Sequence, residues 1–98
     1  MVGLLGKVTV NLHTRLRSAV GKDHVDLVLS PDCNLGCMLK TLEKEYPKLE
    51  PLLKGEFGYR HLMILVNNSH VGPMNKEVLE RKVNDEDVVS ILEPSAAG

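Results

Sequence analysis

The chain has 98 residues, of which 43% are hydrophobic and 26% are charged; this composition fits one globular domain and excludes a disordered chain. Twelve basic and thirteen acidic residues give a formal net charge of -1, which excludes the strongly basic surface of a dedicated nucleic-acid-binding protein. No segment approaches the ~20 apolar residues that span a bilayer, and the first residues lack the pattern of a signal peptide. We therefore expect a cytoplasmic protein with no membrane or nucleic-acid partner.

The first part of the chain predicts two strands joined by a short helical turn. Apolar and polar residues alternate over 7–13 and again over 25–29, which is the period of half-buried strands. Between these segments, Leu16 and Val20 share one face of a helical turn, and Gly21 suits the end of that turn.

The strongest helical pattern covers residues 35–46. Its apolar residues recur with helical spacing on one face: Leu35, Met38, Leu39, Leu42 and Tyr46. Asn34 can accept hydrogen bonds from the free N–H groups of the first turn, and Pro47 cannot continue the helix. A further apolar turn is predicted over 49–55, followed by a loop over 55–58.

A third strand is predicted at 61–66. This nearly continuous apolar run is typical of a strand that is covered on both faces or central in its sheet. The turn-forming residues 67–70 follow, and a short return strand is expected to begin at Val71.

The last part of the chain predicts an irregular turn over 77–83, a β-turn over 84–87 and a final strand over 88–92. The elements together predict an α+β fold: a mixed sheet of four or five strands with one main helix packed on one face. The domain covers 1–94. The four small residues that follow are expected to form an exposed, mobile tail: Ser95, Ala96, Ala97 and Gly98.

Several segments, in this order and spacing, resemble the β-grasp sulfur carriers. The first two segments are residues 8–12 and 15–21, and the next two are the start and the end of the predicted helix, residues 35–39 and 45–47. The last two are residues 64–67, where the predicted hairpin starts, and residues 84–94, which precede the small-residue tail. This family includes the small subunit of molybdopterin synthase, the thiamine-pathway sulfur carrier and the ubiquitin-like small archaeal modifier proteins. The resemblance covers essentially the whole chain and implies a ubiquitin-like fold.

The resemblance also implies that the working group is the C-terminal carboxylate of Gly98. In the family, an ATP-dependent activating enzyme adenylates this carboxylate, which then becomes a thiocarboxylate or forms an isopeptide bond with a lysine. One implied partner is that enzyme. The other is either the large subunit of molybdopterin synthase or the lysines of target proteins. In the first case, Ser95, Ala96 and Ala97 of this chain would enter the active site of the large subunit. The carrier itself would be no enzyme, would bind no cofactor or metal, and would be a monomer when free.

The chain departs from the family at one position, because Ala97 stands where the family typically has the first glycine of Gly-Gly. Two explanations are open: the channel of the activating enzyme accepts the methyl group of Ala97, or native residues follow Gly98. The departure also favours an alternative function, a β-grasp interaction module whose tail is never activated.

The two cysteines, Cys33 and Cys37, are interpreted as ordinary small side chains in a reducing compartment. Their C-x-x-x-C spacing differs from the C-x-x-C of redox motifs. The alternative is a redox or sulfur-relay pair near the start of the predicted helix.

The histidines show no metal-ligand spacing and are interpreted as exposed or hydrogen-bonded: His13, His24, His61 and His70. The acidic run 85–87 is interpreted as part of a β-turn rather than a metal or catalytic site. The chain has no glycine-rich nucleotide-binding loop and no hydrolase motif.

Overall fold

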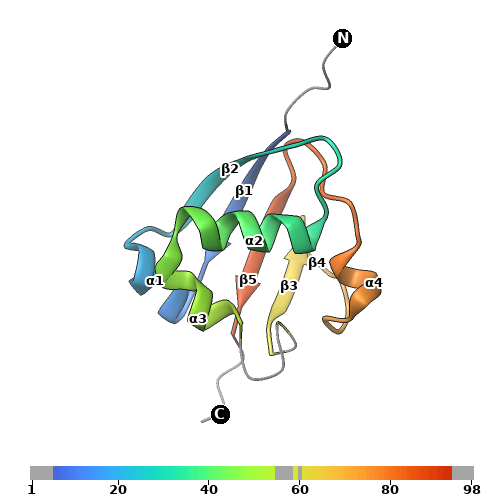
Figure 1. Ribbon diagram of the computed structural model, residues 1–98. Helices are drawn as coiled ribbons and strands as arrows, with labels where there is room; N and C mark the ends of the chain where they lie inside the picture. The colour runs from blue at the N-terminus through green and yellow to red at the C-terminus, as the bar shows by residue number, and fades with distance from the viewer. Residues whose placement is uncertain (1–5, 55–58, 60, 94–98) are drawn as a thin grey trace.

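The strands of the protein form one mixed sheet, and the longest helix crosses one of its faces (Figure 1). The computed structural model describes residues 6–54, 59 and 61–93. The strands are β1 (Gly6–Leu12), β2 (His24–Leu29), β3 (Met63–Val66), β4 (Ser69–His70) and β5 (Val88–Leu92). The helices are α1 (Thr14–Val20), α2 (Leu35–Glu45), the 3-10 helix η1 (Pro47–Leu49), α3 (Glu50–Leu53) and α4 (Lys76–Leu79).

The sheet has the strand order β2-β1-β5-β3-β4, so the last strand lies at its centre. β1 pairs with β2 antiparallel and with β5 parallel, while β3 pairs antiparallel with both β5 and β4. The parallel pairing brings the carboxyl ends of β1 and β5 to the same end of the sheet. The predicted α+β architecture, with a mixed sheet of four or five strands and one main helix, is confirmed.

The alternating sequence pattern gives the sheet a buried face and an open face. In β2, Val25, Leu27 and Leu29 are buried, and the residues between them are exposed. The buried face contacts α2, and together they form an aliphatic core. Its fully buried large side chains are Val8, Leu12, Leu16, Leu27, Leu35, Met38, Leu39, Leu42, Leu49, Leu53, Ile64 and Ile91.

Helix α2 begins and ends close to where the sequence predicts. The Asn34 side chain accepts a hydrogen bond from the Cys37 N–H at 2.8 Å, which satisfies one of the free donors of the first turn. The helix ends at Glu45, one residue earlier than predicted, and Pro47 begins η1. Its predicted apolar face is buried except for Tyr46, which is half-buried.

The hairpin of β3 and β4 corrects the start of both strands. β3 begins at Met63, two residues later than predicted. Of the two alternatives for this strand, a position inside the sheet holds, because β3 lies between β5 and β4, whereas cover on both faces does not, since Met63 is 39% exposed. The return strand begins at Ser69 rather than at Val71. Asn67 and Asn68 have φ angles of 52° and 70°, so these two residues complete a tight turn by themselves and strand pairing resumes at once.

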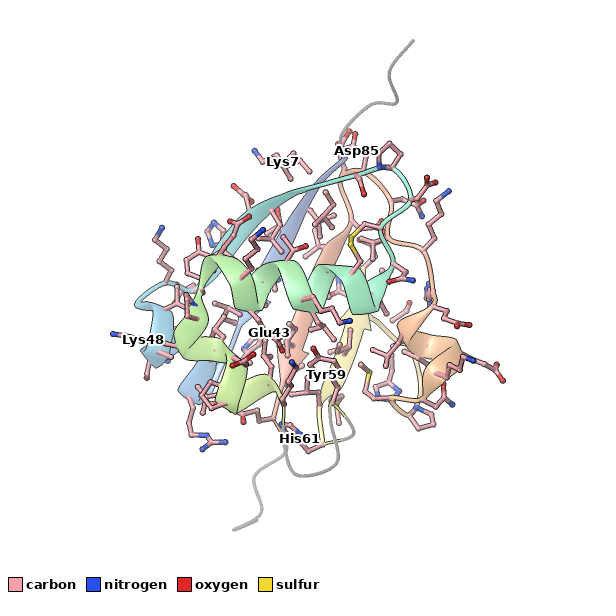
Figure 2. All side chains as sticks on the ribbon, in the orientation of Figure 1. Lys7, Glu43, Lys48, Tyr59, His61 and Asp85 are labelled. Carbon is pink, nitrogen blue, oxygen red and sulfur yellow. A yellow bond between two sulfur atoms is a disulfide. The ribbon has the colours of Figure 1, made fainter. Side chains whose placement is uncertain are left out.

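The turn before β5 is confirmed. The Asp87 carboxylate accepts a hydrogen bond from the Asn84 N–H at 2.8 Å, and Glu86 has a φ of 68°. The Asp85 carboxylate accepts one from the Lys7 N–H at 2.8 Å, which ties this turn to the start of β1 (Figure 2).

The two cysteines form a disulfide bond, Cys33–Cys37, at the start of α2 (Figure 2, yellow bond). The interpretation of these residues as two ordinary thiols is therefore wrong. The spacing of four residues places both sulfur atoms at the same end of the helix, with the Cα atoms 5.3 Å apart. The cysteine count consequently gives no support to a reducing compartment.

A buried carboxylate joins α2 to the segment before β3. Glu43 is buried, accepts a hydrogen bond from the Tyr59 hydroxyl at 2.9 Å, and lies 3.6 Å from the Lys54 ammonium group (Figure 2). Burial, and then the hydrogen bond to Glu43, raise the pKa of Tyr59 above its ordinary value of 10.0.

We expect Tyr59 to keep its proton at a pH where an ordinary tyrosine ionises. Because its pKa is higher in the folded chain, its contribution to the free energy of unfolding is fully present below about pH 10 and is lost as the pH rises through the folded-state pKa. Absorbance titration of a Tyr46→Phe variant, which removes the other tyrosine, checks this. Ionisation of Tyr59 near pH 10 in the folded protein would contradict the assigned hydrogen bond.

Some predicted features lie outside the described residues: the loop over 55–58, the stop at Pro94 and the tail over 95–98. Within 6–54, 59 and 61–93, no helix combines the length and apolar composition that crossing a membrane requires.

Candidate functional site

The described part of the candidate site is the end of the sheet where β5 finishes. Leu92 is the last residue of β5, and Glu93 is the last described residue before the tail. The predicted site residues Ser95, Ala96, Ala97 and Gly98 lie outside the described residues. The surroundings of Leu92 and Glu93 are therefore the surface from which the predicted reactive tail begins.

An ion pair holds Glu93 to α1. The Arg15 guanidinium donates two hydrogen bonds to the Glu93 carboxylate, at 2.6 Å and 3.3 Å. The Glu93 side chain is only 7% exposed, whereas that of Arg15 is 69% exposed. The hydrogen bond to Glu93, and then its negative charge, raise the pKa of Arg15 above its ordinary value. This bidentate contact fixes the backbone just before residue 94.

The topology explains why Arg15 reaches a residue 78 positions away. β1 and β5 are parallel, and α1 begins two residues after β1, so the start of α1 lies beside the end of β5. Thr14, the first residue of α1, has a φ of 48°, a conformation in which a β-branched residue is strained. Arg15 follows this strained residue directly.

The open face of the sheet carries an apolar patch on β3 and β5, which includes the last residue of β5. We call Met63, Leu65, Val88 and Leu92 the outer patch. Met63 and Leu92 are register partners in β3 and β5 and so lie on the same face. Met63 is 39% exposed and Val88 is 37% exposed, and the other two are half-buried. Uncovered apolar side chains grouped on one sheet face form a surface on which a protein partner can dock.

The β1 and β2 side of the open face is mainly polar, although Val28 of β2 is an apolar residue that is 59% exposed there. The Thr9 hydroxyl donates a hydrogen bond to the Asp26 carboxylate at 3.1 Å, and the Asn11 amide donates one to the Ser90 hydroxyl at 3.3 Å. These contacts lie on β1, β2 and β5. The outer patch lies on the β3 and β5 side of the face, which includes the last residue of β5, whereas Val28 lies apart from it on the edge strand β2.

Comparison with known protein families gives a match to the model described as the ThiS family, over residues 10–98. The matched region begins inside β1 and continues through the tail to the last residue. The chain belongs to the ThiS family. The resemblance to β-grasp sulfur carriers that the sequence segments indicated is thereby confirmed. A search of curated proteins found no match.

Solved structures share the fold of this ThiS-family chain. The crystal structure of SAMP1 from Haloferax volcanii has a TM-score of 0.80 at 23% identity and covers 95% of this chain and 100% of its own. The solution structure of small archaeal modifier protein 1 from Methanosarcina acetivorans has a TM-score of 0.75 at 27% identity, covering 98% and 100%. A chain of the BexX/CysO complex from Amycolatopsis orientalis has a TM-score of 0.68 at 26% identity, covering 93% and 99%. The ubiquitin-like β-grasp fold is confirmed.

The histidines of this ThiS-family chain are exposed or hydrogen-bonded, as interpreted. His13 and His24 are exposed, the His61 ring lies 3.0 Å from the Leu52 carbonyl oxygen, and the His70 ring accepts a hydrogen bond from the Gly72 N–H. In the part of the chain that the structure describes, no group of three His, Cys, Asp or Glu side chains could hold a metal ion.

The contact between Arg15 and Glu93 is the feature of the site that sequence reasoning missed. Both residues lie in segments that carry the family resemblance, but no local pattern connects two charges 78 positions apart. Only the parallel pairing of the first and last strands of the ThiS-family fold could have indicated it. The outer patch consists of uncovered residues of the predicted strands 61–66 and 88–92, whose exposure the sequence alone does not show.

Proposed function

We propose that this protein is a sulfur carrier or protein modifier whose Gly98 carboxylate is adenylated by an ATP-dependent activating enzyme. The chain is a member of the ubiquitin-like sulfur-carrier and modifier family. The observation that carries the proposal is that the ThiS-family match does not stop at the sheet but includes the tail through residue 98. The function of the family would therefore involve the tail.

The chemistry of a terminal glycine suits this role. A carboxylate is a poor electrophile until its oxygen becomes part of a good leaving group. The Gly98 carboxylate attacks the α-phosphorus of ATP, and pyrophosphate leaves. A sulfur donor or a lysine amine then attacks the carbonyl carbon, and AMP leaves. A terminal residue without Cβ can adopt backbone conformations in a narrow channel that are closed to other residues.

The proposed partners would dock on the outer patch beside the tail. The related CysO chain was crystallised in a complex with BexX. For this chain we propose the activating enzyme as one partner, with the large subunit of molybdopterin synthase or target-protein lysines as the other. A cytoplasmic location is part of the proposal, because activation consumes ATP.

Incubation with the cognate activating enzyme, ATP and a sulfur donor tests the function. We expect pyrophosphate release, followed by an intact mass in which one oxygen of the chain is replaced by sulfur. Addition of a cell extract distinguishes the two roles, since a modifier becomes attached to lysines of other proteins. If the chain releases no pyrophosphate in the presence of an activating enzyme that is active on its own carrier, the proposal is wrong.

The second candidate function is a β-grasp interaction module whose tail is never activated. Ala97 favours it, because an activating channel shaped for glycine would clash with the added methyl group. An Ala97→Gly variant separates the candidates. A carrier keeps or improves its activation when this methyl group is removed, whereas an inert module is not adenylated in either form.

The ion pair of Arg15 and Glu93 gives a prediction for the carrier role. Arg15→Ala leaves the Glu93 carboxylate without its partner and loosens the origin of the tail, so we expect the activating enzyme's KM for this protein to rise by a factor on the order of 10. The exchange of both charges, Arg15→Glu with Glu93→Arg, should restore much of this loss. Steady-state pyrophosphate release measures it.

The double exchange is also the control. If Arg15 acted only by contacting the enzyme, the double exchange would raise the KM as much as Arg15→Ala does. Equal KM values for Arg15→Ala and the parent would contradict a positioning role.

A further inference from the structure

We propose that Cys33 and Cys37 form a thiol–disulfide exchange site, in which an external thiol attacks Cys37 and the buried Cys33 is the sulfur that leaves and returns. This site is separate from the tail, because the disulfide lies at the start of α2, whereas the tail follows the end of β5. The exchange would therefore be a second property of the protein, which neither the ThiS-family match nor the related structures assign.

The two sulfur atoms differ in access. Cys33 is 2% exposed and belongs to the core, whereas Cys37 is half-buried. Cys37 lines an open groove on the outer side of α2, together with Asn34, Gly36, Lys40, Thr41 and Lys44. A thiol from solution can approach Cys37 through this groove, but it cannot reach Cys33 in the folded chain. The structure thus gives the exchange a direction.

The charges around Cys37 favour a thiolate. Cys37 is the third residue of α2, at the positive end of the helix dipole, which stabilises a negative charge. Lys40, one turn further along the helix, and Lys44 line the same groove and are exposed. These cations attract the incoming thiolate in the first step of the exchange, and they stabilise the Cys37 thiolate that the second step releases.

Backbone hydrogen bonds hold this segment in place independently of the disulfide. The Val83 N–H donates to the Cys33 carbonyl at 3.1 Å, and the Leu35 N–H donates to the Arg81 carbonyl at 2.9 Å. The Asn34 side chain caps the Cys37 N–H at 2.8 Å. Because these contacts involve no sulfur atom, opening the disulfide leaves the start of α2 attached to the segment before β5.

The position of the disulfide does not suit a structural staple. A cross-link stabilises a fold more when it closes a longer loop, and this one joins residues only four apart in the sequence. It bridges two residues that the hydrogen bonds of Asn34 and Val83 already hold. A bond that adds little restraint and has one accessible sulfur is suited to reversible opening.

The exchange balances with a dithiol as co-reactant. A thiolate of the dithiol forms a bond to Cys37 Sγ, the Cys33–Cys37 bond breaks, and its electron pair goes to Cys33 Sγ, which takes a proton. The second thiol of the reagent then attacks its own sulfur in the mixed disulfide and releases Cys37 as a thiolate. The protein disulfide is reduced by two electrons and the dithiol is oxidised to a cyclic disulfide. The reverse sequence restores the starting state.

Equilibration of the full chain in mixtures of reduced and oxidised dithiothreitol tests the reversibility. We expect two thiols to appear together as the mixture becomes more reducing and to disappear together as it becomes more oxidising. Alkylation followed by intact mass measurement counts these thiols. The circular dichroism spectrum should stay that of the folded protein throughout. Two results would overturn the proposal: a disulfide that opens only when the protein unfolds, and cysteines that remain two free thiols under oxidising conditions.

Single-cysteine variants test the direction of the exchange. In Cys33→Ser only the accessible sulfur remains, and in Cys37→Ser only the buried one remains. We expect glutathione disulfide to modify folded Cys33→Ser at least about tenfold faster than folded Cys37→Ser. In denaturant, where both thiols are exposed, the two rates should converge. Equal rates in the folded variants, or faster reaction of Cys37→Ser, would show that Cys37 is not the attacked sulfur.

Discussion

Deletion of Gly98 is expected to lower the rate of adenylation by a factor on the order of 100. The deletion leaves Ala97 as the terminus and moves the carboxylate back by up to ~3.5 Å along an extended chain. It also places a Cβ beside the reacting carbon, where the activating channel would meet glycine. Both changes displace the attacking oxygen from the phosphorus of ATP. Pyrophosphate release in the presence of the activating enzyme measures the effect.

The same deletion should leave the fold intact. The described core lies between Val8 and Ile91, so we expect the Tm to stay nearly unchanged when one terminal glycine is removed. The matched variant is Ala97→Gly, which keeps the length of the tail and restores the family pattern, and it should be adenylated at least as fast as the parent. Equal adenylation of the deletion variant and the parent would mean that Gly98 is not the reacting residue.

Replacement of Leu39 by alanine is expected to lower the free energy of unfolding by about 2–5 kcal/mol. Leu39 is fully buried near the middle of α2, on the face that packs against the sheet. The substitution removes apolar contacts and leaves a cavity, since the strands on the opposite side are held in register and cannot close around the smaller side chain. Denaturant titration of the two proteins gives the difference.

Lys40→Ala is the matched control for this substitution. Lys40 follows Leu39 in the same helix but is exposed. Alanine favours the helix and nothing is removed from the core, so its effect should stay within about 0.5 kcal/mol. A loss for Leu39→Ala no larger than that of the control would contradict the face of α2 assigned here.

Much of the fold could be predicted because local patterns follow the two regular periods. The alternation over 25–29 set which side of β2 is buried, and the helical spacing over 35–46 set the buried face of α2. Asn34 and Pro47 indicated the helix ends, because the capping side chain of Asn34 and the missing backbone N–H of Pro47 affect only the neighbouring turn of the helix. These features depend on residues a few positions apart, and the structure confirms them.

Contacts that depend on the tertiary arrangement could not be predicted in the same way. A continuous apolar run does not reveal how many faces of β3 are covered, and Met63 proved to be exposed. The pairing of Arg15 with Glu93 depends on the parallel placement of β5 beside β1. The disulfide of Cys33 and Cys37 depends on how the chain enters α2, since the same spacing also suits two separate buried thiols.

The most direct test of the proposed function is ATP-dependent pyrophosphate release with three forms of the protein and the cognate activating enzyme. The forms are the chain ending at Gly98, the Gly98 deletion and a version extended to end in Gly-Gly. We predict release with the first form, little with the second, and release at least equal to the first with the extended version if native residues follow Gly98. If neither the parent nor the extended version is adenylated while both are folded, the carrier function is contradicted and the inert interaction module is the better description.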